Sequence, residues 1–121
     1  MLKRKGFTLM EVLIVVIILG ILATIAIPQF ANMVKRARLA EAWTNLAAIR
    51  TAQSVYHLEH DTYATPVANL SDLTLQNNGV NFTYATSGGA TYNATATGVA
   101  GTAYAGISAW QDNTGANGSV H

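Results

Sequence analysis

The sequence predicts an α+β protein in which one long N-terminal α-helix carries a small antiparallel β-sheet head. Residues 12–27 are almost wholly apolar, and apolar residues then recur at helical spacing as far as residue 56. After His60 the sequence changes to short runs rich in Thr, Tyr and Val, separated by glycines. The 121 residues suffice for one domain, and a head of residues 61–121 is near the lower size limit for folding alone.

The apolar segment from Phe7 to Ile27 has about the 20 residues that span a membrane. Glu11 is its only charged residue, and a carboxylate there costs on the order of 3 kcal/mol. A cleaved secretory signal peptide would have a shorter apolar run, and a plain membrane anchor would leave Glu11 unexplained. Cleavage between Gly6 and Phe7 would create an α-amino group that could neutralise Glu11.

The first residues carry a specific pattern. A basic stretch, Lys3-Arg4-Lys5, ends in Gly6, and Phe7-Thr8-Leu9-Met10-Glu11 and the apolar helix follow. This pattern resembles the start of type IV pilins and of the pseudopilins of type II secretion, over about the first quarter of the chain. The resemblance implies a pilin-like fold, a leader of residues 1–6 that a prepilin peptidase removes, and N-methylation of Phe7.

The resemblance also implies a function. We expect a structural subunit, of the major pilin type, of a type IV pilus filament. The precursor would cross the inner membrane once with its N-terminus in the cytoplasm, where the basic leader favours it, and the pilus would be extracellular. The expected partners are other copies of the chain, the prepilin peptidase, the inner-membrane assembly machinery and, before assembly, membrane lipid. Glu11 would pair with the Phe7 amine of an adjacent subunit, whereas local snorkelling of Glu11 is the structural alternative.

Two other functions remain open. A major pseudopilin of a type II secretion system has the same plan, and a membrane-anchored binding domain that never polymerises would share the apolar helix. Cleavage after Gly6 is expected for both kinds of filament subunit and not for the non-polymerising domain, so it distinguishes between them. Adhesion, motility and DNA uptake are not distinguished by the sequence.

The helix is expected to continue beyond the membrane. Residues 7–30 would form the membrane and filament-core part, and residues 31–60 an amphipathic outer part. The outer part should bury one apolar face, comprising Leu39, Trp43, Leu46, Ile49 and Tyr56, whereas Asn45 falls off it. Gly20 and Pro28 interrupt the helical pattern, so a break is predicted between them. Lys35, Arg36 and Arg38 should form a solvated face.

Residues 61–121 are predicted to form a loop and a three-stranded antiparallel sheet. The loop includes a turn or helical fragment around Ser71-Asp72. The predicted strands are residues 80–86, 91–99 and 103–110, with residues 111–121 as a loop.

Several classes of function are excluded or weakly supported. The chain has no cysteine, and its formal net charge of +1 would become −2 without Lys3, Arg4 and Lys5, so no specific nucleic-acid site is evident. His57 and His60 lack a defined third metal ligand, and residues 112–119 have one carboxylate for calcium. No catalytic constellation is present. We therefore expect a non-enzyme without a metal or cofactor.

Overall fold

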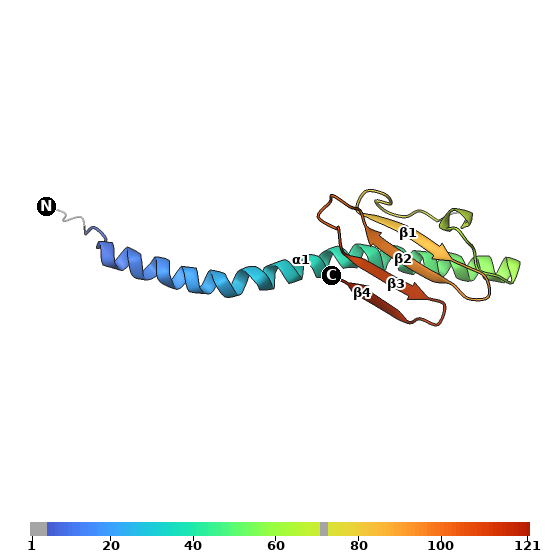
Figure 1. Cartoon of the computed structure of the whole chain (residues 1–121), viewed down its shortest axis with the longest axis horizontal. Coiled ribbons are helices and arrows are strands. Elements are labelled where there is room, and N and C mark those ends of the chain that lie inside the picture. Colours follow the sequence, from blue (N-terminus) through green and yellow to red (C-terminus); the bar gives the residue numbers. More distant parts are fainter. Residues whose placement is uncertain (1–4, 71–72) are drawn as a thin grey trace. The chain divides into compact units, whose positions relative to one another are not determined.

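A computed structural model describes residues 5–70 and 73–121, so residues 1–4 of the leader and the predicted Ser71-Asp72 turn lie outside the described residues. The elements in chain order are helix α1 (Leu9–His60), the short 3-10 helix η1 (Val67–Asn69), and strands β1 (Phe82–Ser87), β2 (Asn93–Gly98), β3 (Ser108–Asp112) and β4 (Asn117–Val120) (Figure 1). The chain divides into two compact units, Met1–Val34 and Lys35–His121.

Helix α1 is bounded by specific local signals at each end. The Thr8 side chain accepts a hydrogen bond from the Glu11 backbone N–H, so the helix begins just after Thr8. Asp61 follows the last helical residue with a φ of 54°, and its N–H donates to the His57 carbonyl at 2.9 Å. A left-handed residue at this position is a common way to end a helix. The helix predicted over residues 7–60 therefore differs from the observed Leu9–His60 only at its start.

Four antiparallel strands form a meander in the order β1-β2-β3-β4, and the C-terminal part of α1 packs against one face of this sheet (Figure 1). The buried core joins Leu46 and Ile49 of the helix to Phe82, Ala94 and Ala96 of the sheet. Alanines on the inner face of β2 leave room for the helical side chains. The predicted α+β class, a long helix with a small antiparallel sheet, is confirmed.

The predicted count of three strands is wrong, because part of the C-terminal segment forms β4. Residues after Asp112 turn back through Gly115, which has a φ of 91°, and the Asp112 N–H donates to the Ala116 carbonyl at 3.0 Å. Strand β4 then pairs with β3, Gly118 lying opposite Trp110. Its Asn, Gly and Ser residues have low strand propensity, so pairing rather than composition makes this segment a strand.

The third predicted strand also begins later than expected. Residues 99–107 form a series of turns rather than a strand, with Gly101 and Gly106 at positive φ. A turn bond joins the Thr102 N–H to the Val99 carbonyl at 3.3 Å, and another joins Ile107 to Tyr104. Only from Ser108 does the chain pair with β2.

Asn45 is buried, contrary to the prediction that it lies off the buried face. Its Nδ2 donates to the Gln76 carbonyl at 2.9 Å and to the Tyr84 hydroxyl at 2.7 Å, while its Oδ1 accepts from the Gln76 N–H at 3.2 Å. A buried amide is stable when its donors and acceptor are paired in this way. Asn45 therefore attaches the loop before β1 to the helix.

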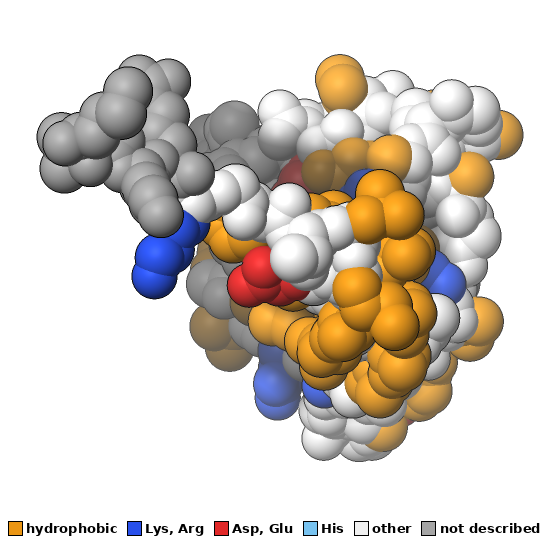
Figure 2. Space-filling model, turned by 90° about the vertical axis from the view of Figure 1, so that its left-hand side faces the viewer, with side chains coloured by type: hydrophobic (Ala, Val, Ile, Leu, Met, Phe, Trp, Pro, Cys, Tyr) orange, Lys and Arg blue, Asp and Glu red, His pale blue; other side chains and the backbone are white. Residues whose placement is uncertain are grey.

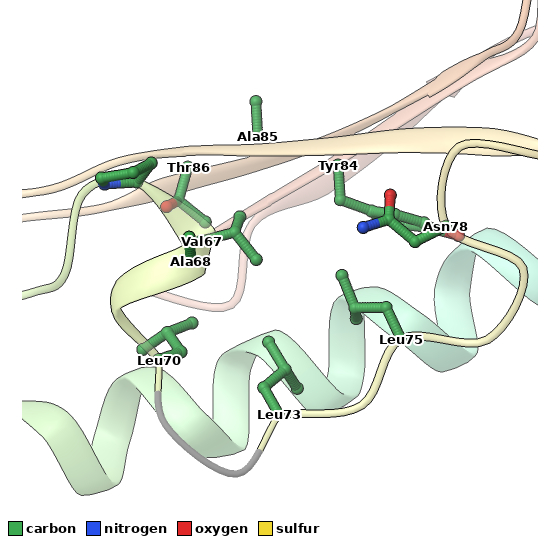
Figure 3. Close-up of a pocket in the computed structure, with 10 residues that line it drawn as sticks. Val67, Ala68, Leu70, Leu73, Leu75, Asn78, Tyr84, Ala85 and Thr86 are labelled. Carbon is green, nitrogen blue, oxygen red and sulfur yellow. The ribbon is translucent and has the colours of Figure 1, made fainter.

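Residues 66–70 around η1, residues 73–78 and strand β1 border a hollow of about 470 Å³ beside the sheet (Figure 3). Leu73 and Leu75 point from the loop towards the sheet, and Tyr84 extends from β1 towards Asn78 (Figure 3). Leu70 is buried in the core, and Leu73 and Leu75 pack against it. These leucines hold an otherwise irregular segment against the head.

Candidate assembly site

The start of α1 places Glu11 in the first helical turn. The Glu11 N–H donates to Thr8 Oγ1 at 3.2 Å, and the Val12 N–H donates to the Thr8 carbonyl at 3.3 Å. Thr8 is therefore the N-cap, and a carboxylate at Glu11 interacts favourably with the positive end of the helix dipole. Sequence reasoning missed this role of Thr8, although Thr-x-x-Glu before an apolar run is the signature of a capping box.

Glu11 lies beside a hydrophobic hollow. Phe7, Val12, Val15 and Val16 line this hollow of about 270 Å³ together with Glu11. Figure 2, which views the molecule from the end that carries the N-terminus, shows an acidic side chain bordered by hydrophobic ones. The structure thus brings Phe7 and Glu11 to one hollow. In the uncleaved chain the Phe7 nitrogen is an uncharged amide, so a positive charge beside Glu11 would require cleavage after Gly6.

The apolar side chains that follow Glu11 are exposed. The most apolar 18-residue window of α1 has a mean hydropathy of 2.9 and is not buried, so by length and composition α1 could cross a membrane. Large side chains such as Ile17 and Leu22 are more than half exposed. This surface needs lipid or other apolar helices to cover it.

The predicted helix break between Gly20 and Pro28 is not present in the isolated chain, because every residue of Leu9–His60 is helical. Pro28 has no N–H to donate to the Thr24 carbonyl. The Thr24 hydroxyl donates to a different carbonyl, that of Ile21, at 2.6 Å and does not replace this bond. One turn before Pro28 therefore lacks a backbone bond, and a break in an assembled filament stays a proposal.

Arg38 does not form part of a purely solvated face. Its Nη1 donates to the Ala103 carbonyl at 2.6 Å, and its guanidinium carbon lies 5.4 Å from the centre of the Tyr104 ring. The turns before β3 approach the helix and supply both the Ala103 carbonyl and the Tyr104 ring. Lys35 is half-buried and Arg36 is exposed.

The histidines near the end of α1 pack on tyrosines. The His60 ring stacks on Tyr56 with centroids 4.1 Å apart, and the His57 ring lies 4.5 Å from Tyr63. Across residues 5–70 and 73–121 no three His, Asp or Glu side chains gather as metal ligands.

Asp112 is used by the β3–β4 turn. Its Oδ1 accepts from the Thr114 hydroxyl at 2.7 Å, the Thr114 N–H at 2.9 Å and the Ala116 N–H at 3.0 Å. These bonds, that of the Thr114 hydroxyl above all, lower the pKa of the Asp112 carboxyl. The Asp112 carboxylate thus stabilises the turn through its Oδ1.

Comparison with known proteins identifies this fold. The family model for type IV pilin-like G and H proteins matches residues 40–120, which include the last 21 residues of α1 and all four strands. The chain belongs to the type IV pilin and pseudopilin family. A second model, the prokaryotic N-terminal methylation motif, matches residues 1–27. Pilin-family proteins are structural rather than enzymatic.

Three relatives of this pilin-family chain are informative. The type IV major pilin protein PilA of Myxococcus xanthus is 50% identical over 62 residues, 51% of this chain and 28% of PilA. The type II secretion system core protein G of Vibrio cholerae is 38% identical over 71 residues, 59% of this chain and 49% of that protein. The type IV major fimbrial protein FimA of Dichelobacter nodosus is 49% identical over 49 residues, 40% of this chain and 31% of FimA. The matched region thus spans half or less of these relatives.

Proposed function

We propose that this chain is the structural subunit of a type IV pilus, held in the inner membrane and assembled through its N-terminal helix. The observation that carries the proposal is the placement of Glu11 beside Phe7 on an apolar helix segment that is not buried. An unpaired carboxylate is costly in lipid, whereas an ion pair with a processed N-terminus would favour an assembled state.

Processing supplies the positive charge. Cleavage after Gly6 by the prepilin peptidase exposes the Phe7 amine, and N-methylation leaves that nitrogen cationic. A Cβ added at Gly6 would meet no atom within 4 Å, so this chain's own packing does not require glycine there. A strict need for Gly6 would therefore reflect the peptidase.

Assembly exchanges lipid for protein around the same surface. In the membrane, acyl chains cover residues 7–30, and in the filament the apolar helices of neighbouring copies replace them. The Glu11 carboxylate of one copy then neutralises the Phe7 amine of the next. The precursor is an inner-membrane protein, its assembly involves the inner-membrane machinery, and the finished filament lies outside the cell.

The pilus is favoured over the secretion filament by the sequence identity of the matched relatives. The matched segments of the two major pilin proteins have higher identity than that of core protein G. The major pseudopilin of a type II secretion system is the second candidate, supported by the longer match to core protein G and by the family model that covers the head. A non-polymerising membrane-anchored domain is the third.

Shearing of surface fibres from cells that produce the chain tests these functions. A pilus subunit should be recovered in the sheared fraction as long filaments by electron microscopy, with methylated Phe7 as its first residue by mass spectrometry. Removal of the gene should then abolish the fibres and leave protein secretion intact. Intact surface fibres with failed secretion would support the pseudopilin, and an uncleaved Met1 terminus would contradict both filament functions.

A further inference from the structure

The sheet face that points away from α1 is polar and has one large aromatic side chain. Side chains alternate between the two faces of a strand, so the residues that alternate with the buried ones along each strand identify this outer face. It presents hydroxyl and amide groups from β1, β2 and β3, among them Ser87, Asn93, Thr95 and Thr97, around the indole of Trp110. We call these five residues the outer-face cluster.

Trp110 lies near the centre of this face. It pairs with Thr95 of β2 on one side and with Gly118 of β4 on the other. A Cβ at Gly118 would stand 2.7 Å from the indole Nε1 and 3.0 Å from Cε2, so the ring lies against the bare backbone there. The Trp110 side chain still has 38% of its surface exposed. Its position is thus fixed while part of the ring remains available.

A shallow hollow lies over β1 and β2. Its volume is about 340 Å³, and Ala85, Thr86, Ser87, Asn93 and Thr95 line it. Thr95, which lines the hollow, is also the β2 partner of Trp110, so the hollow lies one strand away from the tryptophan. Hydroxyl and amide groups can each donate and accept hydrogen bonds. A ligand over the hollow and the ring would therefore meet polar groups at one end and an aromatic surface at the other.

The charge of the face restricts the partner. Asp112, opposite Asn93, is the one charged side chain at the outward positions of the four strands, and its Oδ1 is already bonded within the turn. Without lysine or arginine at these positions, the face lacks the charge complementarity that a nucleic acid or an acidic polysaccharide requires. A neutral, hydroxyl-rich ligand satisfies both the charge and the hydrogen-bonding groups.

We propose that the outer-face cluster binds a neutral polysaccharide. The C–H face of a pyranose ring packs on the Trp110 indole, whose π-face is partially negative. Hydroxyls of the neighbouring sugar bond to Ser87, Asn93 and Thr95 in the hollow. The exposure of this face on a filament rests on the proposed function, because the face is outward only if the helices lie inside the filament. Binding of the polysaccharide by the isolated subunit does not rest on the proposed function.

The test uses the full processed chain, purified in detergent. Binding is measured as the fraction of the protein that insoluble cellulose removes from solution, and alginate beads serve as the acidic comparison. The chain should bind cellulose and not alginate. The substitution Trp110→Ala should weaken binding by about tenfold, the scale of one lost aromatic contact. Ser87→Ala should weaken it about threefold, as expected for one hydrogen bond of modest net strength. Ser119→Ala, the same change on the edge strand away from the cluster, should have no effect.

Trp110 also covers Gly118, so Trp110→Ala could unfold the head, and thermal unfolding is measured for each variant. Thr95→Glu provides an independent test, because it places bulk and charge in the hollow without removing the indole, and it should abolish binding. Absence of binding to cellulose, equal binding to alginate, or full binding by folded Trp110→Ala or Thr95→Glu would each overturn the proposal. Normal filaments with no polysaccharide binding would overturn this inference alone, whereas binding by a subunit that never assembles would overturn only the proposed function.

Discussion

Gln53 pairs with the backbone of Ala64 through both ends of its side-chain amide. Nε2 donates to the Ala64 carbonyl at 2.9 Å, and Oε1 accepts from the Ala64 N–H at 2.8 Å. Both residues are buried, Gln53 on α1 and Ala64 in the loop that follows. The pair fixes the point at which the chain turns back from the helix towards the sheet.

Loss of this amide should destabilise the head. In Gln53→Ala the Ala64 N–H loses its partner, although the Ala64 carbonyl keeps a 3.3 Å bond from the Thr86 hydroxyl. A cavity and a buried unpaired donor together should lower the free energy of unfolding by about 2–4 kcal/mol. Urea unfolding of the full chain in detergent measures this. Ser54→Ala, which removes an exposed hydroxyl one residue along α1, is the control, and an equal loss in both variants would contradict the prediction.

The head should lose stability in acid, because Asp112 stabilises it only while its carboxyl group is ionised. Because the folded-state pKa of Asp112 is below its ordinary value of 3.8, its stabilising contribution is present above that value. The contribution is lost as the pH falls through the lowered pKa. Thermal unfolding of the wild-type chain and Asp112→Asn, measured between about pH 6 and pH 2, should therefore converge at the acid end. A stability difference that is the same at both ends would mean that the carboxylate charge is irrelevant to the turn.

Glu11 should matter for assembly and not for membrane insertion. Glu11→Gln removes the charge and keeps the shape, so insertion should be unchanged or improved. Sheared filament should fall at least tenfold, because loss of one partner of a buried ion pair costs about 3–5 kcal/mol. Immunoblots of membrane and sheared fractions measure both quantities. Glu59→Gln, at an exposed acid near the end of α1, serves as control, and a normal filament yield from Glu11→Gln would remove the need for the pairing.

The segment between Gly20 and Pro28 should lose helix when the filament forms. Proline inside a helix costs about 3 kcal/mol and glycine about 1 kcal/mol relative to alanine. The double substitution of both residues by alanine should preserve membrane insertion and change the rise per subunit or the extensibility of the filament. Cryo-electron microscopy of wild-type filaments should show helical density lost in this segment. A fully hydrogen-bonded helix through Pro28 in the filament would refute the idea.

Much of the fold was accessible from the sequence because periodicity reports burial directly. Leu39, Leu46 and Ile49 repeat at helical spacing and are all buried, and the apolar run before them is exposed as a membrane-length helix should be. Asn45 and Gln53 were not accessible in this way. Their burial depends on backbone groups of loop residues 76 and 64, which periodicity does not reveal.

The head was harder to predict because pairing overrides local propensity there. Strand β4 contains Asn117, Gly118 and Ser119, none of which favours strands, and it exists because the Asp112 turn returns it to β3. At the candidate assembly site, the sequence singled out Gly6, Phe7 and Glu11, whose roles in processing and assembly stay predictions. It did not reveal that Phe7 and Glu11 share a hollow, since that depends on three-dimensional side-chain positions.

The meander topology of the sheet has a consequence for the timing of folding. Each strand pairs with the strand next to it in the sequence, so few of the sheet contacts join distant parts of the chain. Low contact order favours rapid folding. Under the proposed function the head folds after it crosses a membrane, while its own helix is held in lipid, and this topology then lets it complete its sheet from residues that emerge one after another. It does not have to wait for a partner segment from the other end of the chain.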